Sequence, residues 1–490
     1  MNAKIYVLFF LIAVALKLPA QSGDSVSSRT IDSFMTALYD RDQFSGSILI
    51  ARNGKVIYEK AFGLADREKQ FPFTTGTREY IGSISKQFTA MGIMILKDRG
   101  LLDYSQSVRH FFPELPVCMQ VVTIRHLLYH ISGLALFDDS PNMTEKDVLN
   151  ILLKQGSLRF SPGDKFEYCN AGYSLLGMII EKASGQSLNA FMRINIFEPL
   201  GMRNTFVNEI DHRDTARATG YTLYGTINSY DSYMGGNVSI ISTVGDLFKW
   251  DESLYNSQLV KSETLAEAFT PSSVVMNNPS LTLKDNTFGD KSYGFGWWIA
   301  MHDGSKDFFH DGAFSGYIAY NERLTAAHLS IIVLSNLRQP FVYDIRSGIV
   351  HILEGSPYSL PKIPGSVWLH RKTATLGIDS AISLYRIMQQ SADPDYNYAE
   401  IVLNSYAYLL LRAGKVDAAI KIFTLNAAIY PGSFNVYDSL ADGYEMSGNK
   451  ALAIESCKKA LQIDPANEYE KNRIKTLEKG NQQVTKQIPR

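Results

Sequence analysis

The chain has 490 residues, of which 45% are hydrophobic and 20% charged, and its 48 basic and 49 acidic residues leave a net charge of −1. This composition excludes a wholly disordered chain and a collagen-like fibre, and the balanced charge gives no global reason to expect nucleic acid as a partner. A single hydrophobic core is not expected at this length, so the sequence predicts at least two domains.

The first 20 residues have the layout of a secretory signal peptide. One positive charge within Met1–Lys4 precedes an apolar run from Ile5 to Leu16, and the small residue Ala20 ends a predicted cleavage site. Twelve apolar residues are too few to cross about 30 Å of hydrocarbon as a helix. The alternatives are an uncleaved anchor or a buried helix. The segment 1–20 therefore predicts an exported protein, periplasmic or extracellular, with no stable membrane span after signal removal.

Strand-like patterns lie at both ends of the segment 28–354, and helical patterns fill its middle. Near its start, a hairpin is predicted over 44–63, because Asn53-Gly54 supplies the positive φ angles of a two-residue turn. Further strand-like runs follow between 295 and 336. This order predicts an α+β domain, with an antiparallel sheet flanked by helices and a helical insertion.

The character of the sequence changes after residue 354. Prolines make 355–376 a predicted linker, and 377–480 is predicted to be all-α, with a tail at 481–490. A set of residues returns after 34 positions and resembles tetratricopeptide repeats: Ala407, Gly414, Ala419, Ile420 and Pro431, then Ala441, Gly448, Ala453, Ile454 and Pro465. Such a domain either braces its neighbour or binds a protein partner.

The first candidate for chemistry is the S-x-x-K sequence at Ser83 and Lys86. This sequence follows Gly82 and begins a long apolar helical run. The Ser83 hydroxyl and the Lys86 amine are therefore expected on one helix face, about one turn apart. A neutral lysine there could take the serine proton. The same spacing also occurs in the predicted linker and repeats, where no catalytic role is expected, at Ser359, Ser447 and Ser456.

The second candidate is Tyr168-Cys169-Asn170, the one Y-x-N sequence in the chain. A tyrosine can shuttle a proton, and an asparagine can hold the amide of a substrate. Taken alone, Tyr168 is better explained as a packed aromatic residue.

The third candidate is the sequence HDGAFSG, which begins at His310 and lies between two strand-like runs. Gly312 would let a substrate lie along the strand. The same His-Asp-Gly triplet begins at His302, but there it falls at a predicted hairpin turn. His310 is therefore the preferred site residue.

In this order, the S-x-x-K, Y-x-N and H-x-G motifs resemble those of the penicillin-recognising serine hydrolases, in the branch of class C β-lactamases, D-Ala-D-Ala carboxypeptidases and related esterases. Class A enzymes carry S-D-N and K-T-G instead. Three further stretches of residues look like the family, at 123–134, 235–250 and 293–298. The resemblance covers roughly 28–350 and implies a β-lactamase/transpeptidase-like fold.

The resemblance also implies a role for each motif residue. Ser83 would be acylated by the substrate, Lys86 and Tyr168 would share proton transfer, and Asn170 would bind the amide side of the substrate. The backbone N–H groups of Ser83 and Ala313 would form an oxyanion hole, and His310 would stand beside the tyrosine. No cofactor is expected.

A zinc site is a competing interpretation of one segment. His126 and His130 are four residues apart, which is the spacing of zinc ligands on a helix, but no glutamate follows the first histidine. Their stretch also looks like the hydrolase family, so no metal is predicted. The aromatic residues Tyr293, Trp297 and Trp298 could line a groove, although strand aromatics more often pack in a core.

The sequence thus predicts an exported serine hydrolase, a peptidase or esterase that cleaves an amide or ester of a small molecule or peptide. The alternative is a catalytically idle hydrolase-like protein whose repeats recruit a protein partner. In relatives that bind β-lactams, the middle residue of the third motif is usually threonine or serine, and here it is Asp311. Because like charges repel, substrates with a carboxylate are predicted to react poorly, unless strand alternation turns Asp311 away.

Overall fold

The computed structural model describes residues 21–137, 140–211, 213–276, 291–302 and 304–478. The predicted signal peptide (1–20) and tail (481–490) therefore lie outside the described residues. The chain divides into two compact units. The sheet unit comprises Met1–Thr222 and Ile227–Leu360, and the helical unit comprises Leu223–Thr226 and Pro361–Arg490, each within its described residues.

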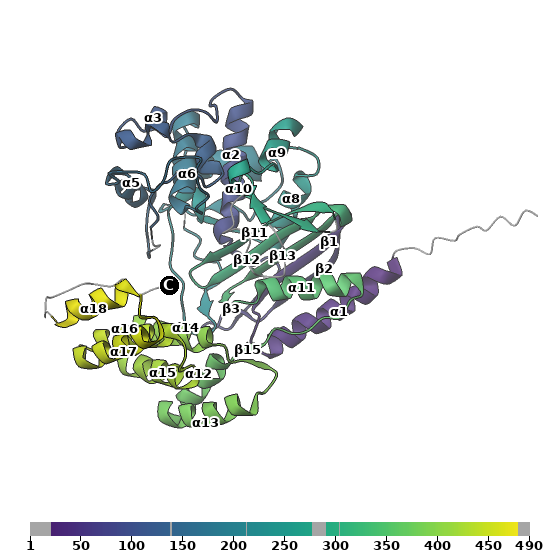
Figure 1. Ribbon diagram of the computed structural model, residues 1–490. Coiled ribbons are helices and arrows are strands. Elements are labelled where there is room, and N and C mark those ends of the chain that lie inside the picture. The colour runs from purple at the N-terminus through teal and green to yellow at the C-terminus, as the bar shows by residue number, and fades with distance from the viewer. Residues whose placement is uncertain (1–20, 138–139, 212, 277–290, 303, 479–490) are drawn as a thin grey trace, which may run out of the picture. The chain divides into compact units, whose positions relative to one another are not determined.

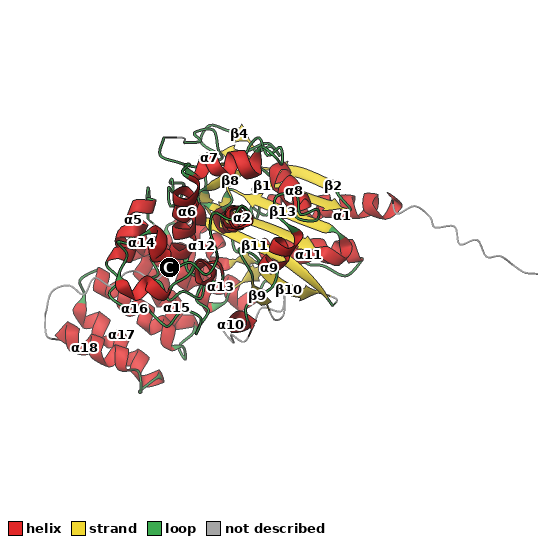
Figure 2. Ribbon diagram, turned by 90° about the horizontal axis from the view of Figure 1, so that it is seen from above, coloured by secondary structure: helices red, strands yellow, loops and turns green. Residues whose placement is uncertain are grey.

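An antiparallel sheet forms the centre of the sheet unit. Among the described residues it has seven strands, in the order β2-β1-β13-β12-β11-β10-β9. The strands are β1 (Gly46–Arg52), β2 (Lys55–Phe62), β9 (Lys291–Tyr293), β10 (Trp298–His302), β11 (Ser305–Phe314), β12 (Tyr317–Leu324) and β13 (Leu329–Ser335). Figure 2 shows β2, β1 and β13 side by side, so the two ends of the unit meet in one sheet.

The predicted hairpin over 44–63 is present as β1 and β2. Its turn residues Asn53 and Gly54 have φ angles of 52° and 70°, as a two-residue turn requires. On the other side, β1 pairs with β13 from Gly46 opposite Ser335 to Arg52 opposite Leu329. The predicted α+β class with an antiparallel sheet is confirmed.

Helices cover both faces of this sheet. Figure 1 shows α2 and α6 on one side and α1 and α11 on the other. The helices of the sheet unit are α1 (Gln21–Asp40), α2 (Ser85–Asp98), α3 (Val108–Phe111), α4 (Ile124–Leu128), α5 (Glu145–Leu153), α6 (Asn170–Ser184), α7 (Leu188–Met192), α8 (Val244–Ser253), α9 (Ser262–Ala268), α10 (Ser273–Met276) and α11 (Val342–Glu354). All residues of α2 from Ser85 to Leu96 are buried, as expected for a helix that is apolar on most of its faces.

A small three-stranded sheet lies outside the main sheet and includes the segment that leads to Ser83. Its strands are β5 (Glu79–Tyr80), β6 (Phe206–Val207) and β8 (Ile240–Ser242), and β8 lies between the other two. The remaining short strands pair as β3 (Leu64–Asp66) with β4 (Phe71–Pro72), β7 (Tyr221–Thr222) with β14 (Leu337–Arg338), and β15 (Ile363–Pro364) with β16 (Tyr396–Asn397). Through β5 and β8, the chain before Ser83 is tied to the chain after residue 239.

The helical unit consists of consecutive helices. They are α12 (Gly365–Leu376), α13 (Ile378–Ser391), α14 (Glu400–Arg412), α15 (Val416–Ile429), α16 (Phe434–Met446), α17 (Lys450–Ile463) and α18 (Glu468–Glu478). The starts of α14 and α16 are 34 residues apart, and so are the starts of α15 and α17. The recurring alanines are buried, and Gly414 and Gly448 have φ angles of 72° and 78° at the turns. The predicted helical C-terminal region is confirmed, and its assignment to the tetratricopeptide family stays a prediction.

The predicted linker differs from the structure in its second half. Residues Gly365–Leu376 form α12, although 355–376 was expected to be irregular because of its prolines. Pro364 stands at the N-cap of this helix, where a missing backbone N–H costs no intrahelical bond. Leu369 is fully buried within the core of the helical unit. The proline signal therefore marks only the segment before α12.

In the described part of the chain, no helix combines the length and apolar character needed to cross a membrane.

Candidate active site

Ser83 lies in a short 3₁₀ turn (Gly82–Ile84) between β5 and α2. Lys86, in the first turn of α2, is fully buried, and its Nζ donates a hydrogen bond to Ser83 Oγ at 3.0 Å. The same Nζ donates to the carbonyl oxygen of Asn237 at 3.1 Å. The structure thus brings together the serine and the lysine of the predicted motif.

Strand β11 packs against the turn that carries Ser83. A Cβ atom on Gly312 would lie 1.9 Å from the carbonyl oxygen of Ile81 and 3.2 Å from the Ser83 nitrogen. Gly82 has a φ angle of 53°, and a Cβ there would lie 2.7 Å from the Ala313 nitrogen. Only glycines permit this approach, which packs the backbone of Gly312 and Ala313 against the turn of Gly82 and Ser83.

Tyr168 and Asn170 stand at the N-terminal end of α6, across from Lys86. Lys86 Nζ lies 5.0 Å from the centroid of the Tyr168 ring. The Trp298 ring is stacked on that of Tyr168, with 6.2 Å between ring centroids and 9° between ring planes. Asn170 Oδ1 is buried and has no hydrogen-bond partner among the described residues. A buried amide oxygen without a partner is open to an N–H donor of a bound substrate.

His310 completes the set from β11. Its side chain is buried, Nε2 lies 3.1 Å from the Tyr293 hydroxyl, and its ring lies 6.2 Å from that of Tyr168. Burial lowers the pKa of His310 to about 4, with Asp311 opposing and Lys86 adding to this effect. Because Nδ1 lies 2.6 Å from the carbonyl oxygen of Asp311, the proton of the neutral ring belongs on Nδ1, and the Tyr293 hydroxyl donates to Nε2.

Burial along β11 alternates around Asp311. His310 and Gly312 are buried, whereas Asp311 and Ala313 are partly exposed. The charge of Asp311 nevertheless acts on the site. The pKa of Tyr293 is raised mainly by burial, then by the neighbouring tyrosines, and also by the charge of Asp311.

The first residue of the second His-Asp-Gly triplet lies where the sequence placed it, and the triplet's Asp303 is outside the described residues. His302 ends β10 and is the register partner of Ser305 in β11, next to the hairpin turn. Of the three aromatic residues weighed as groove lining, Tyr293 and Trp297 are buried in the core, and Trp298 is partly buried against Tyr168.

The two histidines considered for zinc have other contacts. His126 Nδ1 accepts a hydrogen bond from the Thr123 N–H at 3.2 Å and so caps α4. His130 lies against Tyr168, with 4.2 Å between ring centroids. Within the described ranges, no three His, Cys, Asp or Glu side chains are placed so that they could hold a metal ion.

Two residues of the site were not assigned to it from the sequence. The carbonyl of Asn237 accepts a hydrogen bond from Lys86 and so positions it. The preceding Gly236 lets this segment pack closely on α6, because a Cβ there would lie 2.6 Å from the Tyr173 carbonyl oxygen. His130 was considered only as a metal ligand. Both act through backbone groups of distant segments, which leave no periodic signal in the sequence.

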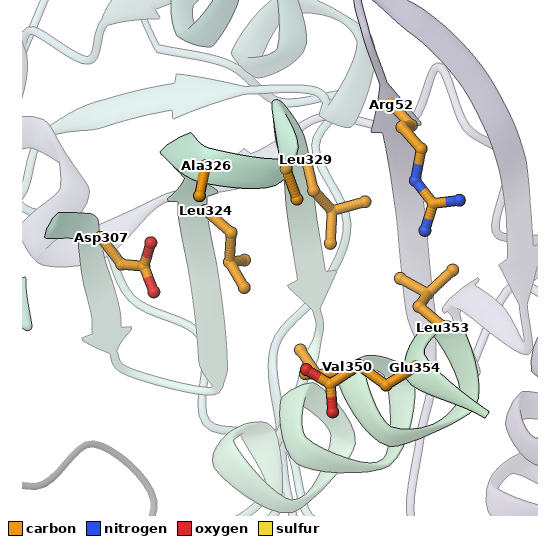
Figure 3. A pocket seen from close by; sticks show the side chains of 9 residues that line it. Arg52, Asp307, Leu324, Ala326, Leu329, Val350, Leu353 and Glu354 are labelled. Atoms are coloured by element: carbon orange, nitrogen blue, oxygen red, sulfur yellow. The ribbon is translucent and has the colours of Figure 1, made fainter. Parts of the chain in front are cut away.

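A separate pocket lies at the other end of β11. It is lined by side chains from the ends of neighbouring strands and from α11, among them Arg52, Asp307 and Glu354 (Figure 3). Asp307 precedes Gly312 by five residues, about 17 Å along an extended strand. The pocket is therefore distinct from the site around Ser83.

Comparisons with known proteins agree with this arrangement. The sequence profile of the family described as Beta-lactamase matches residues 28–351. Penicillin-binding protein 4* of Bacillus subtilis (strain 168) is 31% identical over 369 residues, which cover 68% of this chain and 78% of that protein.

Solved structures share the fold. The octameric penicillin-binding protein homologue from Pyrococcus abyssi is 27% identical, with a TM-score of 0.59 over 71% of this chain and 81% of that chain. A class C beta-lactamase at 21% identity has a TM-score of 0.57 over 69% of this chain and 98% of its own. At that identity the second likeness concerns the fold alone.

Proposed function

Because the chain belongs to the beta-lactamase family of serine hydrolases, we propose that it is an exported hydrolase that cleaves an amide or ester through an acyl-enzyme on Ser83. The observation that carries this proposal is the hydrogen bond of 3.0 Å from Lys86 Nζ to Ser83 Oγ, in a turn against which the backbone of Gly312 and Ala313 packs. A nucleophile, a base and oxyanion donors are then in one place.

In the acylation step, Ser83 Oγ attacks the substrate carbonyl carbon and loses its proton to the neutral amine of Lys86. The N–H groups of Ser83 and Ala313 stabilise the developing oxyanion. The tetrahedral intermediate collapses, and the bond to the leaving group breaks as Tyr168 delivers a proton to that group. The products are the Ser83 ester and a free amine or alcohol.

In the deacylation step, water attacks the Ser83 ester and gives up a proton to the Tyr168–Lys86 pair. The carboxylic acid product leaves, and Ser83 recovers its proton. Neutral His310 supports the pair without adding a positive charge, since burial holds its pKa low. All of this chemistry uses the side chains and backbone of the chain itself.

The substrate side of the proposal concerns Asn170 and Asp311. The Oδ1 atom of Asn170 can accept a hydrogen bond from an N–H of the acyl part. The negative charge of Asp311, whose influence on His310 is described above, disfavours a substrate carboxylate next to it. We therefore propose neutral esters or amides, or amine-bearing substrates, as better substrates than β-lactams or D-Ala-D-Ala peptides.

Two parts of the proposal rest on sequence features. The apolar segment within 1–20 supports export to the periplasm or the outside of the cell. The 34-residue period supports a helical unit that binds a protein partner or braces the hydrolase.

The test is covalent labelling of the full chain with a fluorophosphonate, followed by peptide mass mapping. We expect one modified residue, Ser83, and no label in Ser83→Ala. Ser447→Ala removes the serine of another S-x-x-K sequence, in the helical unit, and is the matched control, with labelling unchanged. Label elsewhere, or turnover of a p-nitrophenyl ester by well-folded Ser83→Ala, would contradict the proposal.

The substrate class is tested with the same protein on three reporters. A p-nitrophenyl ester, a D-amino-acid amide and nitrocefin are compared by kcat/KM. The proposal expects the neutral ester or the amide to exceed nitrocefin, and efficient nitrocefin hydrolysis by the wild type would contradict it.

A further inference from the structure

His130 follows α4 and is almost completely buried, with 1% of its surface exposed. Its backbone has a φ angle of 57°, in the left-handed region that few residues other than glycine adopt, with asparagine, aspartate and histidine the most frequent among them. Such a conformation persists only where the surrounding structure holds it, and it is concentrated at functional sites. The contacts of His130 therefore need an explanation.

Three contacts join His130 to the segment that contains Tyr168. The carbonyl oxygen of His130 accepts a hydrogen bond from the Glu167 N–H at 2.9 Å. Its Nδ1 accepts one from the Cys169 N–H at 3.0 Å. Its ring lies against the Tyr168 ring, with 4.2 Å between centroids and 34° between planes. One histidine thus holds the backbone on both sides of Tyr168 and the tyrosine ring as well.

The ring of His130 is suited to this contact because it is neutral. Burial is the main cause that holds the pKa of His130 well below its usual value, and the protonated forms of the nearby Lys86 and His310 would lower it further. Since Nδ1 accepts a hydrogen bond, the ring proton belongs on Nε2. That atom is buried and has no hydrogen-bond partner among the described residues.

We propose that His130 is a positioning residue that holds Tyr168 over Lys86 for proton transfer. The inference rests on the proposed function of Ser83. Tyr168 precedes α6, so its backbone is not fixed by helical hydrogen bonds, and the bonds to His130 take their place. A misplacement of about 1 Å in a catalytic group can cost about 10²-fold in rate.

The experiment uses two variants that both fit the left-handed backbone. His130→Gly removes the ring and the Nδ1 acceptor, and His130→Asn restores an acceptor oxygen where Nδ1 was. We expect kcat for ester hydrolysis to fall about 10²-fold in His130→Gly, with KM changed less than about threefold. In His130→Asn most of the loss should be recovered.

The matched control is His126→Ala, which removes a second histidine whose Nδ1 also accepts a backbone N–H bond. It should leave kcat within about twofold, because loss of a capping contact affects stability instead. Thermal melts of all variants report whether the fold is kept.

A double-mutant cycle with Tyr168→Phe separates positioning from general damage. If His130 acts through Tyr168, adding His130→Gly to Tyr168→Phe should cost less than about twofold. Full additivity, an equal loss in His126→Ala, or a normal kcat in His130→Gly would each overturn the proposal. A wild-type chain that no fluorophosphonate labels at Ser83 would instead overturn the proposed function.

Discussion

The sheet unit and the helical unit achieve close packing by different means. In the helical unit, consecutive helices pack through small side chains that return every 34 residues, such as Ala407 and Ala441. In the sheet unit, the site joins segments far apart in the sequence, as in the bond from Lys86 to Asn237 across 151 residues. The helical unit therefore has many equivalent packing contacts, whereas the site of the sheet unit depends on a few contacts that no neighbouring residue can replace. Substitutions of similar size should therefore have very different effects on activity.

The largest effect is expected from the tyrosine of the site. Tyr168→Phe removes only a hydroxyl, so the fold should remain, while kcat should fall about 10³-fold because general acid–base catalysis is lost. Stopped-flow or steady-state assays with a p-nitrophenyl ester measure this change.

The control is Tyr129→Phe, which removes a buried hydroxyl that donates to the Thr270 carbonyl oxygen at 2.7 Å. It should cost about 1 kcal/mol of unfolding free energy and leave kcat nearly unchanged. Equal rates for the two variants would show that the proton shuttle lies elsewhere.

The next largest effect is expected where two backbones meet. Gly312→Ala places a Cβ 1.9 Å from the Ile81 carbonyl oxygen, so β11 must move away from the turn of Ser83. Loss of one oxyanion donor costs about 10²-fold or more in kcat, and this shift displaces the Ala313 donor. Kinetics with the ester and a thermal melt measure both consequences.

Gly245→Ala is the matched control for that experiment. This glycine lies in α8, and a Cβ there would have no heavy atom within 4 Å. Alanine should be neutral or slightly stabilising in a helix. If Gly312→Ala behaves like Gly245→Ala, the close approach of β11 has no role in catalysis.

The sequence predicted the parts of the molecule that depend on local patterns. The turn at Asn53-Gly54, the antiparallel sheet and the helical C-terminal region follow from residue periods and turn chemistry. The motif residues Ser83, Lys86 and Tyr168 were found because their spacing resembles a known family, and the structure places them together.

What the sequence could not predict depends on backbone groups brought together by folding. The carbonyl of Asn237 and the Nδ1 bond of His130 to the segment of Tyr168 follow no spacing rule, since the partners lie 151 and 39 residues apart. The helix over Gly365–Leu376 was also missed, because the prolines before it suggested an irregular segment. Proline excludes a helix interior and is compatible with the start of a helix.

A smaller effect, on selectivity, is expected at Asp311. Asp311→Thr removes the carboxylate and adds a hydroxyl, so the ratio of nitrocefin to neutral-ester kcat/KM should rise about tenfold. Asp311→Asn removes the charge alone and separates repulsion from the new hydroxyl. An unchanged ratio in both variants would mean that the partly exposed Asp311 side chain does not face the substrate.

The smallest effect on activity is expected in the helical unit. Ala441 is fully buried in α16, so Ala441→Leu forces extra volume into a packed site and should cost about 1–3 kcal/mol of unfolding free energy. Ala451→Leu, at an exposed position of α17, is the matched control and should cost little. Calorimetry follows the unfolding of the two units, and ester hydrolysis follows the site.

The outcome for Ala441→Leu also decides between the two roles of the helical unit. If the helical unit binds a partner, its melting transition should move to lower temperature in Ala441→Leu. The kcat should stay within about twofold, because the contacts around Ser83 lie in the sheet unit. If it braces the hydrolase, ester hydrolysis should be lost as the helical unit melts. If Ala441→Leu loses ester hydrolysis at the temperature where its helical unit melts, and Ala451→Leu does not, then local packing in the helical unit sustains the long-range contacts of the sheet unit.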